Sequence, residues 1–165
     1  MKGEDDARFR EFVAQRQPAL VRTARLLTGD WASGEDLVQA ALIKTYLAWS
    51  RIEDKGAVEG YVRKTMARLA ISWARKRSWS ERPTAEPPDR AVTDPDRAAG
   101  DDPLWRAVRA LPPRQRAVLV LRFHADLSEA DTAAELGISV GTVKSQTSRA
   151  IAALRGRLTV AEVAP

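Results

Sequence analysis

The 165-residue sequence has no cysteine and only one histidine, His124. Without cysteine it cannot form a disulfide, a thiolate nucleophile or a cysteine-based zinc site, which fits a cytoplasmic protein. It also lacks a glycine-rich phosphate loop, a Gly-x-Ser-x-Gly motif and a cluster of metal ligands. We therefore expect no enzyme activity of its own, no metal and no cofactor.

Long hydrophobic runs are missing as well. Residues 1–6 are mostly polar or charged and no apolar segment follows them, so we expect no signal peptide. The longest apolar runs are far too short to cross a bilayer, so we expect no membrane insertion.

The sequence offers two groups of titratable side chains that could be considered for catalysis. His124 lies just before Asp126, and such a pair can act as a general base. No candidate nucleophile accompanies the pair, so a solvated histidine at a helix end is the favoured interpretation. Glu129, Asp131 and Glu135 share one side of a short predicted helix, for which we expect a solvated acidic face.

Positive charge, by contrast, is in excess. The formal net charge is +5 and the sequence pI is about 10.0, which fits a polyanionic partner. Hydrophobic residues make up 44% and charged residues 30%, as in globular chains of one domain or two small ones.

The most informative stretch lies between residues 133 and 149 and predicts a helix-turn-helix. Gly137 suits the left-handed residue that ends a helix, and Ser139 suits the N-cap of the next helix. Where the two helices of the motif cross closely, Ala133 supplies the small side chain of the first helix and Val143 the apolar side chain of the second. The first helix is expected to begin with a capping box at Ser128.

The second helix of this motif has two unlike faces. The packing face consists of Val143, Thr147, Ala150, Ile151 and Leu154. No acidic residue occurs from 139 to 159, so the outward face offers hydroxyls and cations, as a helix in the DNA major groove requires. Its predicted DNA contacts are Thr142, Lys144, Ser145, Ser148 and Arg149. An ordinary amphipathic helix with a solvated outer face is the alternative.

Helical periodicity in the N-terminal half predicts three helices, over residues 6–27, 33–50 and 58–77. Pro18 is expected to kink or divide the first, and a capping box at Ser33 to open the second. The core face of the second helix is expected to hold Val38, Ala41, Leu42, Thr45 and Trp49. Its other side carries a further apolar-leaning stripe of Asp36, Gln39, Ala40, Ile43 and Leu47. Such a helix is either fully buried or docks a partner with one face, and both alternatives stay open.

The third helix is strongly basic and interleaves aromatic residues with its cations. Tyr61, Trp73 and Trp79 could stack unpaired bases while the charges hold phosphates, although we favour a core position for Trp73. Cations favoured by the dipole at a helix end are the alternative. The predicted contacts with single-stranded DNA are Tyr61, Arg63, Lys64, Arg68, Arg75, Lys76 and Arg77.

A proline-rich, acidic stretch from residue 83 to 103 divides the chain. It holds five of the nine prolines and six acids against two arginines, so it cannot build a core. The C-terminal half predicts short helices over 104–111, 114–124 and 128–136 before the recognition helix, with a frayed tail beyond Leu158. We therefore predict an all-α fold of two small domains, 1–82 and 104–165, on a flexible linker.

The C-terminal motifs resemble region 4 of the extracytoplasmic-function group of sigma-70-like RNA polymerase sigma factors. The resemblance rests on LPPRQR (111–116), VLVLR (118–122), GTVKS (141–145) and RA (149–150). Residues 143–149 are most similar to an actinobacterial subgroup, the SigE family. The resemblance implies that the recognition helix binds the −35 promoter element as duplex DNA.

The N-terminal half resembles region 2 of the same family through EDLVQ (35–39), YVRK (61–64) and AISW (70–73). This implies that the third helix binds the melted −10 element and that loop 51–60 captures a flipped base. It also implies a docking site on a coiled coil of the polymerase largest subunit, formed by Asp36, Gln39, Ala40 and Ile43. The chain departs from the family at Leu42, Arg68 and Ser72, where Phe, Asn and Asp are frequent.

Together these resemblances imply a sigma factor that binds core RNA polymerase, including its upstream flap region, and directs transcription initiation. An anti-sigma protein is a further candidate partner. A freestanding helix-turn-helix regulator is one alternative, because GTVKS is also similar to recognition helices of response regulators. An RNA-binding or scaffold protein that uses the basic helix is another.

Overall fold

Every regular element in the two described stretches, residues 2–80 and 102–163, is helical, which confirms the all-α prediction. The structure is a computed structural model, and the side chains of residues 78–80 and 160–163 are outside its description. The side chain of Trp79 and most of the predicted linker therefore lie outside the description.

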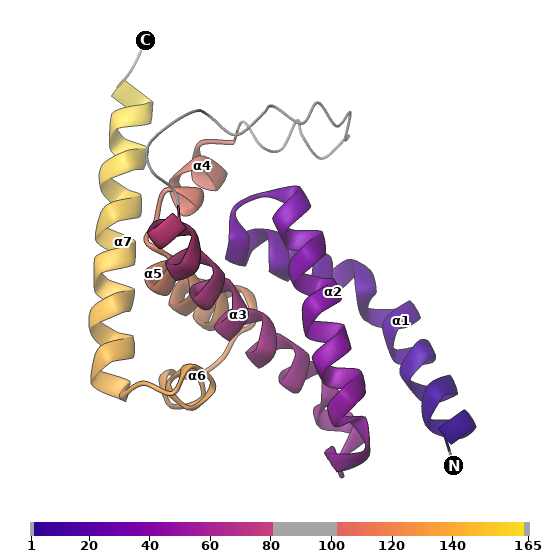
Figure 1. Cartoon of the computed structure of the whole chain (residues 1–165). Coiled ribbons are helices and arrows are strands. Elements are labelled where there is room, and N and C mark those ends of the chain that lie inside the picture. The colour runs from indigo at the N-terminus through magenta and orange to yellow at the C-terminus, as the bar shows by residue number, and fades with distance from the viewer. Residues whose placement is uncertain (1, 81–101, 164–165) are drawn as a thin grey trace.

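Two groups of helices follow each other along the chain (Figure 1). The N-terminal unit consists of α1 (Lys2–Thr28), α2 (Trp31–Ala48) and α3 (Val58–Ser80), with short 3-10 turns η1 (Trp49–Arg51) and η2 (Lys55–Ala57) before α3. The C-terminal unit consists of α4 (Pro103–Arg109), α5 (Pro113–Leu119), the π-helical turn η4 (Val120–His124), α6 (Glu129–Leu136) and α7 (Val140–Val163).

The boundaries of the first two helices differ from the prediction. Pro18 lies inside α1, which continues past it to Thr28, so the proline does not divide the helix. The capping box at Ser33 is wrong because α2 already begins at Trp31. Asp30 is the N-cap, and its Oδ1 accepts hydrogen bonds from the backbone N–H groups of Ala32 and Ser33 at 3.0 and 3.3 Å.

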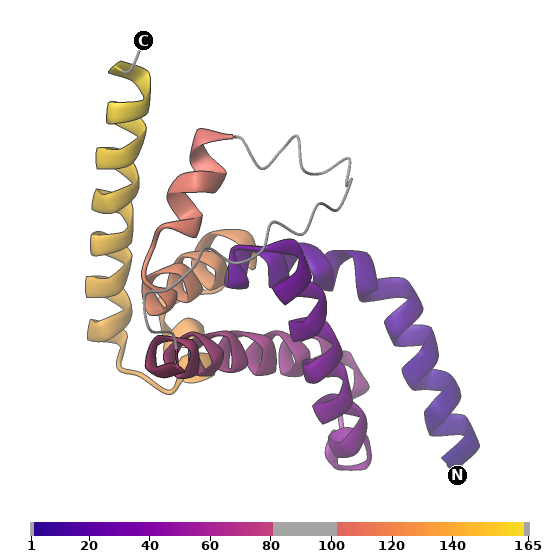
Figure 2. The same cartoon turned by 45° about the horizontal axis from the view of Figure 1, so that its top comes forward.

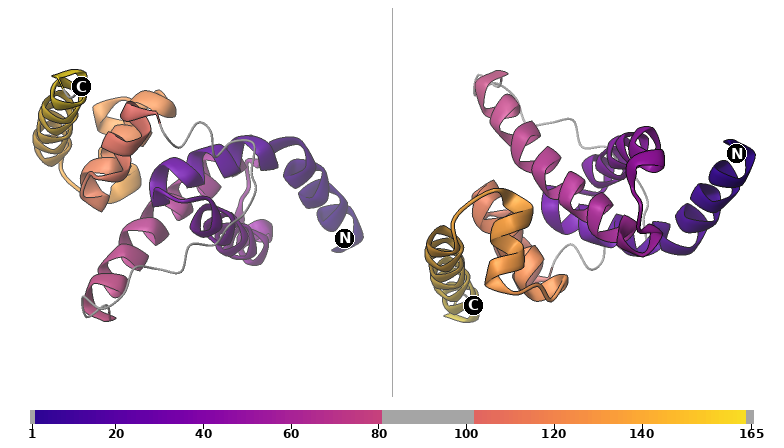
Figure 3. Two further views of the ribbon diagram at one scale, coloured as in Figure 1. Left: turned by 90° about the horizontal axis from the view of Figure 1, so that it is seen from above. Right: turned by 90° about the horizontal axis from the view of Figure 1, so that it is seen from below.

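One hydrophobic core spans both units. Leu20, Ala24 and Leu27 of α1 belong to the same buried cluster as Met66 of α3. The C-terminal unit adds Ala117, Val120 and Leu121 to this cluster, all at most 4% exposed. Figure 2 shows α5 lying against α3 and the end of α1, and Figure 3 shows α7 on the outer side of the C-terminal unit. The two units are therefore packed together.

The helix-turn-helix forms as the sequence predicts. Ser128 Oγ accepts a hydrogen bond from the N–H of Asp131 at 3.0 Å and caps α6. Gly137 adopts the left-handed conformation with φ +67°, and Ser139 Oγ accepts from the N–H of Thr142 at 3.0 Å. A second small cluster of Val118, Ala133 and Val143 holds α5, α6 and α7 together.

Two glycines of this motif should respond oppositely to alanine. Gly137→Ala forces a Cβ into the left-handed region and should lower the free energy of unfolding by about 1 kcal/mol. Gly141→Ala places a Cβ in the first turn of α7, 3.8 Å from Ser139 Oγ, and should raise it by about 0.5–1 kcal/mol. Urea denaturation of both variants tests this, and equal shifts of the same sign would contradict it.

Candidate nucleic-acid and protein interfaces

The outward face of α7 presents most of the predicted DNA contacts. Lys144, Ser145, Ser148 and Arg149 are exposed. Thr142 is half-buried in the first turn, where its hydroxyl lies 2.9 Å from Ser139 Oγ. Lys144 Nζ lies 3.9 Å from Glu129 Oε2, which is a weak pairing because the lysine side chain is largely in solvent. The cations of this face are thus accessible to a ligand.

The opposite side of α7 fixes this orientation. Val143 and Ala150 are fully buried, and α7 packs on α4, α5 and α6. The Thr147 hydroxyl donates a hydrogen bond back to the carbonyl of Val143 at 2.7 Å, which satisfies it inside the packing face. The predicted division of the helix into a packing face and an outward face is confirmed.

The cationic side chains of the basic helix α3 differ in solvent exposure. Arg68, Arg75, Lys76 and Arg77 are exposed, whereas Tyr61, Arg63 and Lys64 are half-buried. Trp73 is half-buried against the main core, which confirms the favoured position for it.

Tyr61 and Lys64 line an open cleft of about 740 Å³ between α3 and the loop that precedes it. The loop contributes Arg51 and Asp54, so the cleft combines an aromatic ring with charges of both signs. Lys55 shapes the loop by donating hydrogen bonds to the carbonyls of Trp49 and Ile52 at 2.5 and 2.8 Å. The cleft has the aromatic and polar groups that a single unstacked base would need.

The second stripe of α2 is exposed, which removes full burial as its explanation. Ile43 is 61% and Leu47 70% exposed, and Asp36 and Gln39 lie on the surface near them. Ala40 is half-buried between them. An apolar stripe with polar groups at its border is typical of a protein-docking surface.

Next to this stripe, Tyr46 joins α2 to the start of α1. Its hydroxyl donates a hydrogen bond to Asp6 Oδ1 at 2.7 Å, and this bond raises the pKa of Tyr46 above its usual value. The ring of Phe9 contacts the Tyr46 ring edge-on at a centroid distance of 5.2 Å. The N-terminal turns of α1 thereby support the edge of the exposed stripe.

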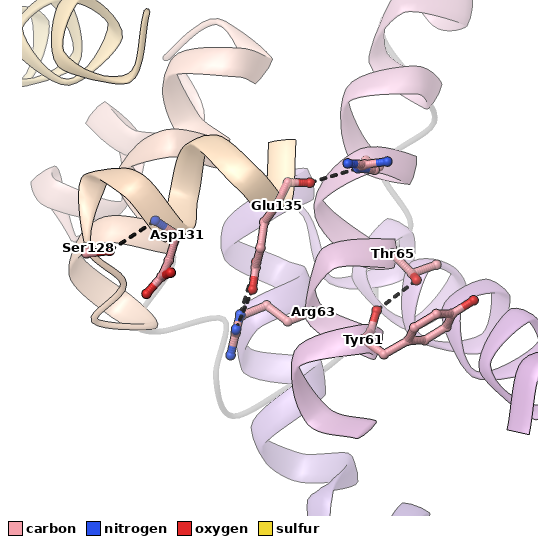
Figure 4. A network of polar contacts seen from close by, with 7 residues as sticks. Tyr61, Arg63, Thr65, Ser128, Asp131 and Glu135 are labelled. Atoms are coloured by element: carbon pink, nitrogen blue, oxygen red, sulfur yellow. Dashed lines mark hydrogen bonds and ion pairs between the residues drawn. The ribbon is translucent and has the colours of Figure 1, made fainter. Parts of the chain in front are cut away.

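Glu135 is a residue that the sequence interpretation placed wrongly. Its side chain is only 15% exposed instead of solvated, and it reaches α3 across the two units. Its Oε1 accepts a hydrogen bond from Arg63 Nη2 at 2.5 Å and its Oε2 accepts one from Arg63 Nε at 3.3 Å (Figure 4). Arg68 Nε donates to the backbone carbonyl of Glu135 at 2.7 Å.

Arg116 is a second contact that the sequence did not reveal. Burial lowers the pKa of this guanidinium, whose Nε donates to the carbonyl of Leu27 at 2.9 Å and whose Nη1 donates to that of Arg109 at 3.0 Å. Arg116 therefore supplies hydrogen-bond donors to backbone carbonyls near the ends of α1 and α4. Leu27 lies 89 residues before Arg116, so sequence spacing could not pair its carbonyl with α5.

His124 lies against Thr23 of α1. Its Nε2 lies 3.2 Å from Thr23 Oγ1, and burial together with Arg22 lowers its pKa, so the ring is neutral at pH 7. Among the residues with described positions, no three His, Asp or Glu side chains gather as a metal site would require. Within the same ranges, no helix has the length and apolar character needed to cross a bilayer.

Comparison with protein families finds two matches along the chain. Residues 12–80 match the family described as Sigma-70 region 2, which covers α2, α3 and most of α1. Residues 101–154 match the family described as Sigma-70, region 4, which covers α4 to α6 and most of α7.

Known proteins match over nearly the whole chain. The RNA polymerase sigma-E factor of Streptomyces avermitilis is 42% identical over 151 residues, covering 91% of this chain and 84% of that protein. The ECF RNA polymerase sigma factor SigL of Mycobacterium tuberculosis is 33% identical, covering 90% of this chain and 88% of its own. A solved structure, the sigma factor RpoE of Bartonella quintana in complex with the anti-sigma factor NepR, matches with TM-score 0.69 and 25% identity, covering 92% of this chain and 97% of that one.

Proposed function

Because the chain belongs to the extracytoplasmic-function group of sigma-70-like RNA polymerase sigma factors, we propose that it binds core RNA polymerase and directs initiation at specific promoters. The observation that carries this proposal is the presence of both family regions in one chain, with exposed cations on α3 and on α7. It acts as a specificity subunit with no catalytic step of its own, in the cytoplasm with the polymerase.

The family matches over residues 12–80 and 101–154 support a division of the chain into two domains. Residues 1–82 form the region 2 domain, 83–103 the linker and 104–165 the region 4 domain. On its own, each domain offers a small surface for DNA. Polymerase would align the two and thereby raise their joint affinity for a promoter.

The exposed face of α7 binds the −35 element in the major groove. Lys144 and Arg149 can donate to guanine O6 and N7, while the serine hydroxyls of Ser145 and Ser148 adapt to several bases. Thr142, in the first turn of α7, is placed to contact the phosphate backbone beside the groove.

The basic face of α3 binds the separated strand of the −10 element. Arg63, Lys64, Arg68 and the cations from 75 to 77 hold phosphates, and the cleft beside Tyr61 receives one unstacked base. Stacking on Tyr61 supplies affinity for any base, so the polar groups of the cleft determine the choice of base.

The exposed stripe of α2 docks on the polymerase. Ile43 supplies an apolar anchor, Asp36 and Gln39 supply polar contacts at its border, and Ala40 lets the partner approach closely. The partner surface is the coiled coil of the largest subunit, and the region 4 domain meets the upstream flap. The Bartonella quintana relative was solved in complex with an anti-sigma factor. We propose that an anti-sigma protein would compete for the surfaces of this chain.

Replacing Arg149 tests the −35 assignment. Arg149→Ala should weaken promoter recognition by about 1–3 kcal/mol and relax the preference at one base pair of the element, because a base-edge contact is lost. Transcription from promoters with single-base changes measures both effects. Arg155→Ala, also exposed on α7 but further from the turn, is the matched control. An unchanged base preference in Arg149→Ala would refute the base-edge role.

A further inference from the structure

A second pocket, of about 290 Å³, lies between α3 and the helix-turn-helix. Three arginines line it, Arg68 and Arg75 from α3 and Arg114 from α5, and we call it the arginine pocket. All three side chains are exposed, so their guanidinium groups are accessible to a ligand. Figure 2 shows α3 and α5 side by side, and the pocket takes its walls from both units.

The arginine pocket carries positive charge without an acid of its own. No aspartate or glutamate is among the residues that line it, whereas three acids and two cations line the cleft beside Tyr61. Within the part of the chain that the structure describes, Arg75 and Arg114 form no ion pair. Guanidinium groups around one pocket repel one another, and a bound anion would relieve this repulsion.

The polar groups of the pocket suit a phosphate or carboxylate head group. Arg68 is held by the hydrogen bond from its Nε to the Glu135 carbonyl at 2.7 Å, and its terminal nitrogens form the fork that pairs with such oxygens. Thr142 and Gln146 of α7 add a hydroxyl and an amide to the lining. Thr142 lies in the first turn of α7, where the helix dipole also favours negative charge.

The rest of the lining is aliphatic. Val118 has no exposed surface, and Ile71, Leu136 and Ile138 are half-buried. No aromatic side chain lines the pocket, so a nucleic-acid base would find no ring to stack on there. DNA phosphates would leave these apolar side chains unused, whereas an alkyl chain would be removed from water against them.

We propose that the arginine pocket binds a small organic anion. Its phosphate or carboxylate head pairs with the arginines, and its short aliphatic chain lies against Ile71, Leu136 and Ile138. The volume is near the lower limit of small-molecule sites, about 300 Å³, which suits a small molecule rather than a protein segment. The bound anion would compete with the −10 strand for Arg68 and Arg75, and this consequence alone rests on the proposed function.

Calorimetric titration of the whole chain with four probes tests the site. Octyl phosphate and octanoate, both below their micelle concentrations, carry the two head groups on one aliphatic chain. Inorganic phosphate lacks the chain, and octyl glucoside lacks the charge. At least one of the two anions should bind at one site per chain, about 10-fold or more tightly than either control probe, because burial of two methylene groups already gives that factor.

Two variants locate the binding. Arg114→Gln should weaken binding of the anion by about 10-fold or more, because a charge-assisted pair is lost. Arg106→Gln is the matched control, since Arg106 is an exposed arginine of the same unit that does not line the pocket. Ile71→Ala should weaken binding of octyl phosphate by about 3- to 10-fold and leave that of inorganic phosphate unchanged. Urea denaturation checks that each variant is folded.

Three results would overturn the site. They are no saturable binding of either octyl anion, equal affinity for an octyl anion and a control probe, and equal affinity in Arg114→Gln and Arg106→Gln. The titration uses the free chain without polymerase or DNA. A chain that binds the anion but fails to support initiation would therefore refute the proposed function and leave the arginine pocket established.

Discussion

Val143→Asp is expected to unfold the helix-turn-helix and to abolish recognition of the −35 element. Val143 has no exposed surface and packs against Val118 and Ala133 in the small cluster that joins α5, α6 and α7. An aspartate there must either bury an unpaired carboxylate or expose the cluster, at a cost of about 4 kcal/mol or more. The cost approaches the whole stability of a small domain.

The measurement for this variant is urea denaturation followed by circular dichroism, together with binding to a −35 duplex. Ser148→Asp is the control, because Ser148 is exposed on the same helix and accepts a charge without burial. It should keep wild-type stability within about 0.5 kcal/mol and lose DNA binding through repulsion of phosphates. Wild-type stability in Val143→Asp would contradict the packing described for α7.

Paired replacement of Ile43 and Leu47 by aspartate should weaken binding to core RNA polymerase by about 100-fold or more. Both side chains project from α2 with 61% and 70% of their surfaces exposed, so the fold gains little from them. An apolar anchor at the centre of an interface typically contributes about 2 kcal/mol or more to binding. Two aspartates at these positions remove the apolar contacts. In the complex their carboxylates would also lose water, which opposes binding.

Competition with a labelled wild-type chain for core polymerase measures this effect. Leu104→Asp is the matched control, since Leu104 is an exposed leucine of another helix, α4, with 49% of its surface accessible. All variants should unfold at nearly the wild-type urea concentration. If the α2 double variant competed as well as Leu104→Asp, the stripe would not be the docking surface.

Local signals in the sequence were sufficient for the helices and for the helix-turn-helix. Ser128, Gly137 and Ser139 act within three or four residues of their own position, so spacing alone predicts their backbone contacts. The N-cap of α2 was predicted wrongly at Ser33. The N-cap is Asp30, which lies three residues earlier and whose carboxylate accepts hydrogen bonds from the first free N–H groups of α2. Asp30 and Ser33 are both suitable N-cap residues, and only the backbone path of the turn decides which of them begins the helix.

Contacts between the two halves could not be predicted in this way. Glu135 lies 72 residues from Arg63, and Arg116 lies 89 residues from Leu27. Helical periodicity places Glu135 on the polar side of α6, and a polar side is normally interpreted as solvent-exposed. Periodicity carries no information on whether another unit packs against that side. Burial of Arg116 is likewise set by how α5 packs against α1. Family resemblance was equally silent, since the matching motifs describe each region by itself.

The stripe of α2 shows where sequence and structure complement each other. Periodicity identified Asp36, Gln39 and Ile43 as one face and left burial and docking as alternatives. Exposure of Ile43 in the folded chain excludes burial. The docking role itself, like the DNA contacts of α3 and α7, remains a prediction for mutagenesis.

Transcription by core RNA polymerase with and without this protein tests the central claim most directly. The assay would use a set of promoters with varied −35 and −10 sequences and read the transcripts by length. The account predicts transcripts only when the protein is added, with start sites set by both elements and lost in the paired α2 variant. Sequence-specific binding to duplex DNA without any binding to polymerase would contradict it and would indicate a freestanding helix-turn-helix regulator.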